Sequence, residues 1–215
     1  IAKGAAFKEA WNELYSDIIE YHPNCKLSDV DTTKKSVSYV QSSKDGFDQT
    51  KKSMNYEVLN LIAYNKANPV VEMAGLETSK DVFKKVIMNG CSFASKSDAD
   101  VYAVGDIVGH GIPPSGQTAN WAGKQCAKEI AHRLHKKAFK HEVETKTVKA
   151  GNVCYSIVGD KPEEAIMVVH DFSYNGSVIK GKGHVPKGKN GKFRSKIIAK
   201  STREWYRGVM GDLFA

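Results

Sequence analysis

The amino-acid sequence predicts an α/β fold whose C-terminal part is of the α+β class, and three features lead to that prediction. A short apolar run, Val101–Val104, ends at Gly105-Asp106 and is followed by a turn rich in glycine and proline. A long helical pattern with a small or apolar face follows the turn. Two strand-like runs, 153–158 and 165–169, come after Gly151, with Lys161-Pro162 as the turn between them. A strand, a turn and a helix in this order are typical of a unit of an α/β protein.

The N-terminal third predicts a mixture of helix and strand. Apolar residues at helical spacing predict a helix over residues 5–17. Ile18-Ile19 and residues 37–40 are candidate short strands, and Asp45-Gly46 is a hairpin turn signal. The apolar run at residues 58–63 predicts a buried strand.

The middle of the chain predicts a helix that begins after Ser115, whose hydroxyl suits the N-cap position. One face of this helix is expected to pack against a sheet, with small or apolar residues at positions 119, 123, 126, 127, 130, 131 and 134. Arg133 and His135 lie where positive charge complements the negative end of the helix dipole. His132 and His135 have no carboxylate or cysteine at a convincing spacing, so no metal site is predicted. The basic stretch at residues 180–196 is expected to be a solvated loop, with a docking patch as the alternative, and a final helix is expected from about Ala199.

The turn at Gly105-Asp106 suits the binding of a flavin. The carboxylate of Asp106 could accept a hydrogen bond from a ribityl hydroxyl, and Gly105 has no side chain to block close approach. A helix that begins at Ser115 directs free backbone N–H groups and a positive dipole end at a bound anion, such as a reduced flavin. An ordinary strand–turn–helix of an α/β protein is the alternative interpretation of the same residues.

The chain resembles the flavin-binding half of flavocytochrome c sulfide dehydrogenase, and more loosely the sulfide:quinone oxidoreductases of the pyridine nucleotide–disulfide oxidoreductase superfamily. The resemblance depends on Pro113, Ser115-Gly116 and Ala119-Asn120, on residues 152–156, and on the ending that contains Trp205. Two departures are Pro114, where the family usually has lysine, and residues 63–66, where it usually has Pro-Pro-Gln-Lys.

The resemblance implies a portion of a flavoprotein fold with two dinucleotide-binding domains. We assign residues 1–76 to the tail of the second nucleotide-binding-like domain and residues 77–150 to the C-terminal part of the FAD-binding domain. By the same resemblance, residues 151–215 are assigned to a C-terminal domain of the flavocytochrome c sulfide dehydrogenase type. No Gly-x-Gly-x-x-Gly fingerprint occurs in the sequence, so the N-terminal βαβ unit is expected to lie outside it.

The resemblance also implies an FAD-dependent sulfide dehydrogenase of the periplasm that passes electrons to a c-type cytochrome subunit. Cys154 would be one member of a redox-active disulfide that sulfide attacks, whereas Cys126 is expected in the core and Cys25 and Cys91 have no assigned role. The residues implied to contact FAD are Gly105, Asp106, Pro113, Ser115, Gly116, Asn120 and Trp205. His110 is expected on the surface, and a place near the pyrophosphate of FAD is the alternative. This chain alone is expected to hold no flavin.

Two other function classes compete with this interpretation. The formal net charge of +8 allows a non-catalytic, basic module that binds a polyanion. Nucleic-acid modules usually present interleaved aromatic residues or a basic helix, so no nucleic-acid partner is predicted. A related flavin disulfide reductase that uses quinone or NADH is the third possibility. No apolar run approaches the roughly 20 residues of a membrane span.

Overall fold

The computed structural model describes residues 3–145 and 151–214 and divides into two compact units. The smaller unit comprises Tyr15–Tyr64, and the larger comprises Ile1–Leu14 together with Asn65–Ala215. The domain boundaries expected at residues 76 and 150 stay predictions. Helices and antiparallel sheets are both present, as expected of the α+β part of such a flavoprotein.

The smaller unit is a three-stranded antiparallel sheet in the order β1 (Cys25–Asp31), β2 (Ser36–Ser42) and β3 (Gln49–Asn55). Val37 and Tyr39 on the central strand are buried, which confirms the strand predicted at residues 37–40. Asp45-Gly46 lies in the loop between β2 and β3, and Gly46 has a φ of +84°. The predicted hairpin turn is therefore confirmed, because glycine adopts this left-handed conformation without steric strain.

Two strands predicted in this unit are wrong. Ile18-Ile19 forms no strand, and residues 58–63 lie outside regular structure with Val58 89% and Ile62 86% exposed. An apolar run becomes a buried strand only where a neighbouring strand offers backbone partners. Within the described residues of this unit, the only sheet ends at Asn55, so the run at 58–63 has no ladder to join.

The larger unit contains a second antiparallel sheet, formed by β4 (Gly151–Asp160), β5 (Glu163–Tyr174), β6 (Ile179–His184) and β7 (Arg194–Ser195). β5 pairs with the other three strands. The strands and the turn predicted between residues 153 and 169 are confirmed. The helices of this unit are α1 (Gly4–Leu14), α2 (Val70–Met73), α3 (Gly116–Leu134), α4 (Glu142–Thr145) and α5 (Lys196–Phe214), with a 3-10 turn, η1 (Gly105–Ile107).

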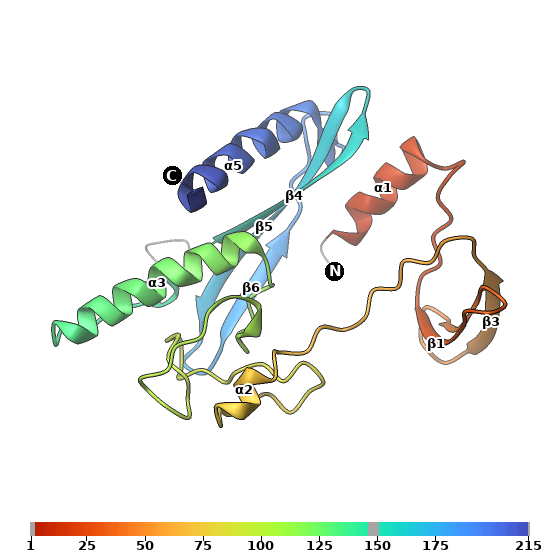
Figure 1. The fold of residues 1–215 in the computed structure, drawn as a ribbon. Coiled ribbons are helices and arrows are strands. Elements are labelled where there is room, and N and C mark those ends of the chain that lie inside the picture. The colour runs from red at the N-terminus through yellow and green to blue at the C-terminus, as the bar shows by residue number, and fades with distance from the viewer. Residues whose placement is uncertain (1–2, 146–150, 215) are drawn as a thin grey trace. The chain divides into compact units, whose positions relative to one another are not determined.

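Helices cover the β4–β5 hairpin from both sides, with α1 and α5 on either side of it (Figure 1). Successive strand residues point to opposite faces, so both faces of β5 can be buried. Ile166 of β5 packs with Ala6 and Ala10 of α1, while α5 makes its most extensive contacts with β5. The helix predicted at residues 5–17 is confirmed but ends at Leu14.

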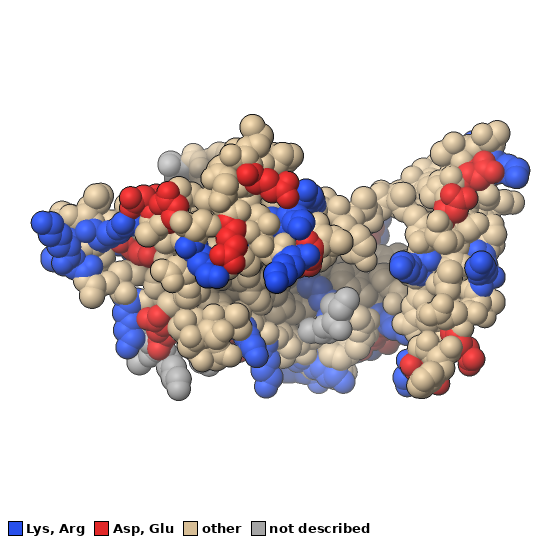
Figure 2. All heavy atoms as spheres, turned by 90° about the horizontal axis from the view of Figure 1, so that it is seen from below, with Lys and Arg blue, Asp and Glu red and all other residues tan. Residues whose placement is uncertain are grey.

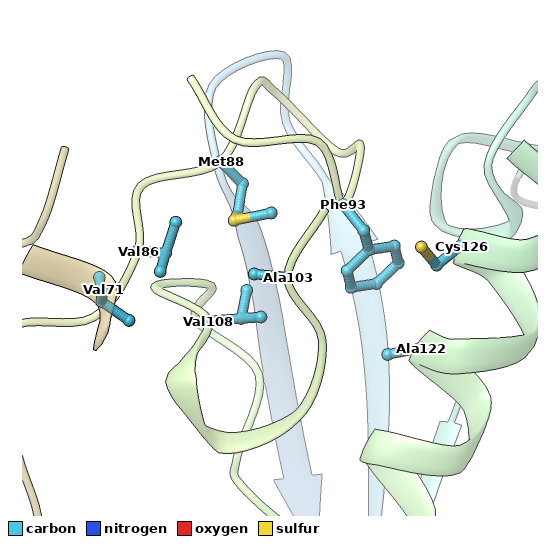
Figure 3. Packing of buried hydrophobic residues seen from close by; sticks show 8 residues of the cluster. All are labelled: Val71, Val86, Met88, Phe93, Ala103, Val108, Ala122 and Cys126. Atoms are coloured by element: carbon cyan, nitrogen blue, oxygen red, sulfur yellow. The ribbon is translucent and has the colours of Figure 1, made fainter. Parts of the chain in front are cut away.

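Residues 65–134 build their core from loops and from α3. Phe93, Met88, Val86 and Val108 come from irregular segments and meet Ala122 and Cys126 of α3 (Figure 3). Single bridges such as Val86↔Val108 and Ala94↔Tyr102 hold these segments together. No helix within the described residues combines the length and the apolar character needed to span a bilayer.

The face of α3 that is buried differs from the predicted one. The helix itself and its N-cap are confirmed, but the buried residues are Thr118, Ala122, Gln125 and Cys126. Of the seven positions predicted to pack on a sheet, only Cys126 is buried, and Leu134 is 77% exposed. The loops that carry Phe93 and His141 cover the more polar face, where Glu129 and Gln125 find hydrogen-bond partners.

The expectation that residues 180–196 form one solvated loop is wrong. Residues 180–184 belong to β6, and Arg194 in β7 is only 4% exposed. The guanidinium of Arg194 contacts three carboxylates, those of Glu13 and Glu164 at 2.8 Å and that of Glu9 at 3.4 Å. These ion pairs fix α1 to the sheet, because a buried arginine requires opposite charges close to it.

Candidate functional site

The apolar run before Gly105-Asp106 does not form the predicted strand. Val101–Val104 makes two backbone hydrogen bonds with the segment 93–95, from Ser95 N to Val101 O at 2.7 Å and from Ala103 N to Phe93 O at 2.9 Å. Only one bridge results, and the chain then turns into η1. Gly105 has a φ of +81°, which a side chain would oppose, so glycine is needed where the chain turns toward α3.

The turn and the N-terminus of α3 enclose a small cavity. Its walls include Gly105, Asp106, His110, Ser115 and Thr118, with Phe93 and Ala122 below. The cavity volume is about 20 Å³, which is room for about one water molecule. The cavity therefore takes a single small polar group, while the exposed carboxylate of Asp106 is available for a larger ligand outside it.

Ser115 connects this cavity to β4. Its hydroxyl caps α3 by accepting a hydrogen bond from the backbone N–H of Thr118 at 3.1 Å, as the sequence predicts. The same hydroxyl donates to Oδ1 of Asn152 at 2.9 Å, and Nδ2 of Asn152 donates to Sγ of Cys154 at 3.2 Å. Asn152 and Cys154 share one face of β4 because side chains alternate along a strand. The fully buried Asn152 thus holds the sulfur in a fixed relation to the start of α3.

A second set of contacts fastens α5 to the same end of α3. The indole N–H of Trp205 donates to Oε1 of Gln117 at 2.8 Å, and its ring lies 5.6 Å from that of Tyr155, next to Cys154 in β4. Asn120 and Lys124 of α3 contact the carboxylate of Asp212 in α5. An open hollow of about 470 Å³ lies between the two helices and includes Asn120 and Trp205 in its lining.

The structure brings most of the predicted site residues to the start of α3. Gly105, Asp106 and Ser115 line the small cavity, Asn120 and Trp205 line the open hollow, and Cys154 is joined to Ser115 through Asn152. Pro113 accepts a hydrogen bond at its carbonyl from Thr118, and Gly116 is the first residue of α3. Asn152 and Gln117 were not predicted as site residues, because their roles depend on partners that lie 37 and 88 positions away in the sequence.

The environments of the cysteines distinguish Cys154 from Cys91 and Cys126. Burial, followed by a hydrogen bond to Glu144, raises the pKa of Cys91 to about 12, and burial also raises the pKa of Cys126. A thiol held in its protonated form is a poor nucleophile. Cys126 lies in the core as predicted, whereas Cys154 is half-buried beside the candidate site. Within the described residues, all four cysteines are unpaired.

Two histidines and a glutamate lie next to Phe93, which lines the small cavity. His110, expected on the surface, is half-buried, and its ring packs edge-on against Phe93 with the centroids 5.3 Å apart. His141 lies 3.1 Å from Glu129, and Ser92 also donates to Glu129. Although burial acts to raise it, the hydrogen bonds from His141 and Ser92 keep the pKa of Glu129 below its ordinary value. Among the residues that the structure describes, no cluster of histidine, cysteine and carboxylate side chains could hold a metal ion.

The charges do not form a continuous basic surface on the face shown in Figure 2, where lysine and arginine side chains lie between aspartate and glutamate. Several of the basic residues are engaged in ion pairs, among them Arg194, Arg203 and Lys124. This arrangement gives little support to a module that binds a polyanion through charge alone.

Comparison with known families identifies the C-terminal part of the chain, although no curated protein matches it. Residues 147–214 match the family model of the flavin-binding domain of flavocytochrome c sulphide dehydrogenase. The matched range includes Asn152, Cys154 and Trp205, which the structure joins to the start of α3. Residues 147–214 are therefore similar to the flavin-binding domain of flavocytochrome c sulphide dehydrogenase.

Proposed function

We propose that this chain is part of an FAD-dependent sulfide dehydrogenase, a periplasmic enzyme that passes electrons to a c-type cytochrome subunit. The observation that supports this proposal most directly is the hydrogen-bonded connection from Ser115 through Asn152 to Cys154. It joins the cap of α3 to the cysteine of the matched domain. A flavin site and a redox-active cysteine must be adjacent for electrons to pass between them.

The residues at the start of α3 have the chemistry that a flavin requires. Asp106 offers an exposed carboxylate to ribityl hydroxyls, and Gly105 leaves the backbone accessible. Trp205 offers an indole ring beside the open hollow, where a flat ring system could pack against it. Asn120 lies in the same hollow, while the helix N-terminus at Ser115-Gly116 favours negative charge. These residues would hold the cofactor, with Asp106 at the ribityl chain and Trp205 beside the ring system.

A flavin held by these residues would supply an acceptor for an electron pair from a thiolate and a donor of single electrons to the cytochrome. Cys154 takes part in the preceding step as one half of a redox-active disulfide. Hydrosulfide forms a new sulfur–sulfur bond with one sulfur of that disulfide, and the old bond breaks to leave a thiolate on the other. The product on the attacked sulfur is a persulfide. Asn152 positions Cys154 throughout by donating to Sγ.

The proposal is tested by adding sulfide to the intact, oxidised protein without oxygen. The visible absorbance of the flavin is expected to fall with sulfide and to recover when a c-type cytochrome is added as the acceptor. Recovery with a quinone and not with cytochrome would instead favour a sulfide:quinone oxidoreductase, and bleaching by NADH but not by sulfide would indicate a related disulfide reductase. A protein that holds no flavin and binds DNA with steep salt dependence would support the polyanion module.

Replacing Asp106 with alanine is expected to weaken binding of FAD by the intact protein. A charged hydrogen bond contributes about 1.5–3 kcal/mol. Because Asp106 is exposed, we expect an effect near the lower limit, about tenfold in Kd. Isothermal titration of the flavin-free protein measures this. Asp29→Ala, at an exposed carboxylate of β1, is the control. Equal affinity of Asp106→Ala and Asp29→Ala would remove Asp106 from the site.

A further inference from the structure

The segment Gly109-His110-Gly111 is held in place by backbone contacts on both sides of the histidine. The N–H of Gly109 donates to Val86 O at 2.9 Å, and the N–H of Gly111 donates to Ile179 O at 3.1 Å. A Cβ on Gly109 would lie 2.8 Å from Val86 O, and one on Gly111 would lie 2.4 Å from Ile179 O. Neither position accepts a side chain without displacing backbone, so the two glycines are needed to fix His110 where it is.

The side chain of His110 is also fixed, yet one of its nitrogens is unused. The ring packs edge-on against Phe93, which is only 1% exposed, and it lines the cavity that Asp106 and Ser115 share. Nε2 of His110 is buried and has no hydrogen-bond partner among the described residues. Buried polar atoms are almost always paired, and one that is not is unfavourable in the absence of a ligand or a water molecule. A histidine that lines a cavity, on a rigid backbone and with an unpaired ring nitrogen, is suited to a binding contact.

The charge state of His110 restricts what it can bind. Burial, followed by the proximity of His141, lowers its pKa to about 4, so the ring is neutral near pH 7. Phosphate groups are recognised chiefly by cationic side chains and by arrays of backbone N–H groups. A neutral imidazole instead exchanges one ordinary hydrogen bond with a neutral group. The cavity volume of about 20 Å³ admits one hydroxyl and excludes a phosphate.

We infer that His110 binds a hydroxyl of the flavin's ribityl chain, with Nε2 as the hydrogen-bonding atom and Asp106 as the neighbouring contact on the same chain. This inference rests on the proposed function, because it requires that a flavin occupies the start of α3. It assigns His110 to the ribityl chain and not to the pyrophosphate.

The test compares His110→Phe with the wild-type protein in the intact, flavin-free form. Phenylalanine keeps the flat ring and removes Nε2, so thermal unfolding without flavin is expected to be unchanged or to occur at a higher temperature. Binding of riboflavin and of FAD is expected to weaken by the same factor, about tenfold, which is the effect of one neutral hydrogen bond. Lumiflavin, which lacks the ribityl chain, is expected to bind equally to both proteins.

Two further variants complete the test. His110→Gln, whose amide can reach the place of Nε2, is expected to recover part of the riboflavin affinity. His132 lines neither the small cavity nor the open hollow, so His132→Phe is expected to bind all three flavins as the wild type does. Three results would overturn the inference while leaving the proposed function intact. In His110→Phe, these are a loss of affinity for FAD alone and a loss of affinity that extends to lumiflavin. The third is a His110→Gln variant that binds riboflavin as weakly as His110→Phe does. A wild-type protein that binds no flavin would overturn both.

Discussion

The variant Cys154→Ser is expected to retain flavin but to lose flavin reduction by sulfide, by a factor on the order of a thousand or more. Serine has nearly the size of cysteine and can still accept the hydrogen bond that Asn152 donates, so the connection to Ser115 should survive. What is lost is the sulfur that takes part in disulfide exchange, which no oxygen can replace. Stopped-flow recording of the flavin absorbance after mixing with sulfide measures the rate.

Two other cysteines provide controls for this variant. Cys25→Ser changes an exposed thiol in the smaller unit, and Cys126→Ala changes a thiol in the core. Both are expected to be reduced by sulfide at the wild-type rate. Thiol titration of the oxidised protein adds a second measurement, since removing one half of a disulfide should free its partner. A wild-type reduction rate in Cys154→Ser would show that this cysteine is not the redox residue.

The variant Arg194→Met is expected to cause the largest loss of stability, about 3 kcal/mol in the free energy of unfolding. Removing one member of a buried ion pair costs about 3–5 kcal/mol, and the lower value applies here because the carboxylates of Glu9, Glu13 and Glu164 are partly exposed. The three carboxylates would then repel one another without a cation between them. Chemical denaturation followed by far-UV circular dichroism measures the loss.

The matched control for Arg194→Met is Arg203→Met, which removes the partner of Glu163 at 2.7 Å on the surface. This pair is exposed, so the control is expected to change stability by about 1 kcal/mol or less. Equal losses in the two variants would show that burial of Arg194 does not determine its contribution.

The ion pairs of Arg194 also predict a dependence of stability on pH. Hydrogen bonds from Lys192 and Arg194 hold the pKa of Glu13 below its ordinary value of 4.5. A carboxylate with a lowered pKa in the folded state stabilises folding above its ordinary pKa, and this contribution disappears as the pH falls through the folded-state value. The wild-type protein should therefore lose stability in acid below about the ordinary pKa of glutamate, and Arg194→Met should lose less over the same range. Denaturation midpoints measured across that range compare the two.

Local sequence patterns predicted the parts of the fold whose partners are close in the chain. Ser115 caps α3 through an atom three residues away, and β4 and β5 pair across the short turn at Lys161-Pro162. In contrast, the apolar runs at 58–63 and 101–104 carry no information about whether a neighbouring strand is present. The structure gives neither run a full strand partner within the described residues, so both strand predictions are wrong.

The sequence predicted the motifs of the candidate site but not the contacts that connect them. The sequence alone determined that Gly105-Asp106, Ser115 and Cys154 lie in motifs that resemble those of a flavoprotein, because each motif is short and chemically distinctive. Only the tertiary structure decided that Asn152 joins Ser115 to Cys154, that Arg194 is buried among carboxylates, and that His110 lines the cavity and has an unpaired ring nitrogen. Burial and the pairing of polar groups are properties of contacts between distant segments. A histidine or an arginine looks the same in the sequence whether water or a carboxylate surrounds it, and folding alone determines which of these it meets.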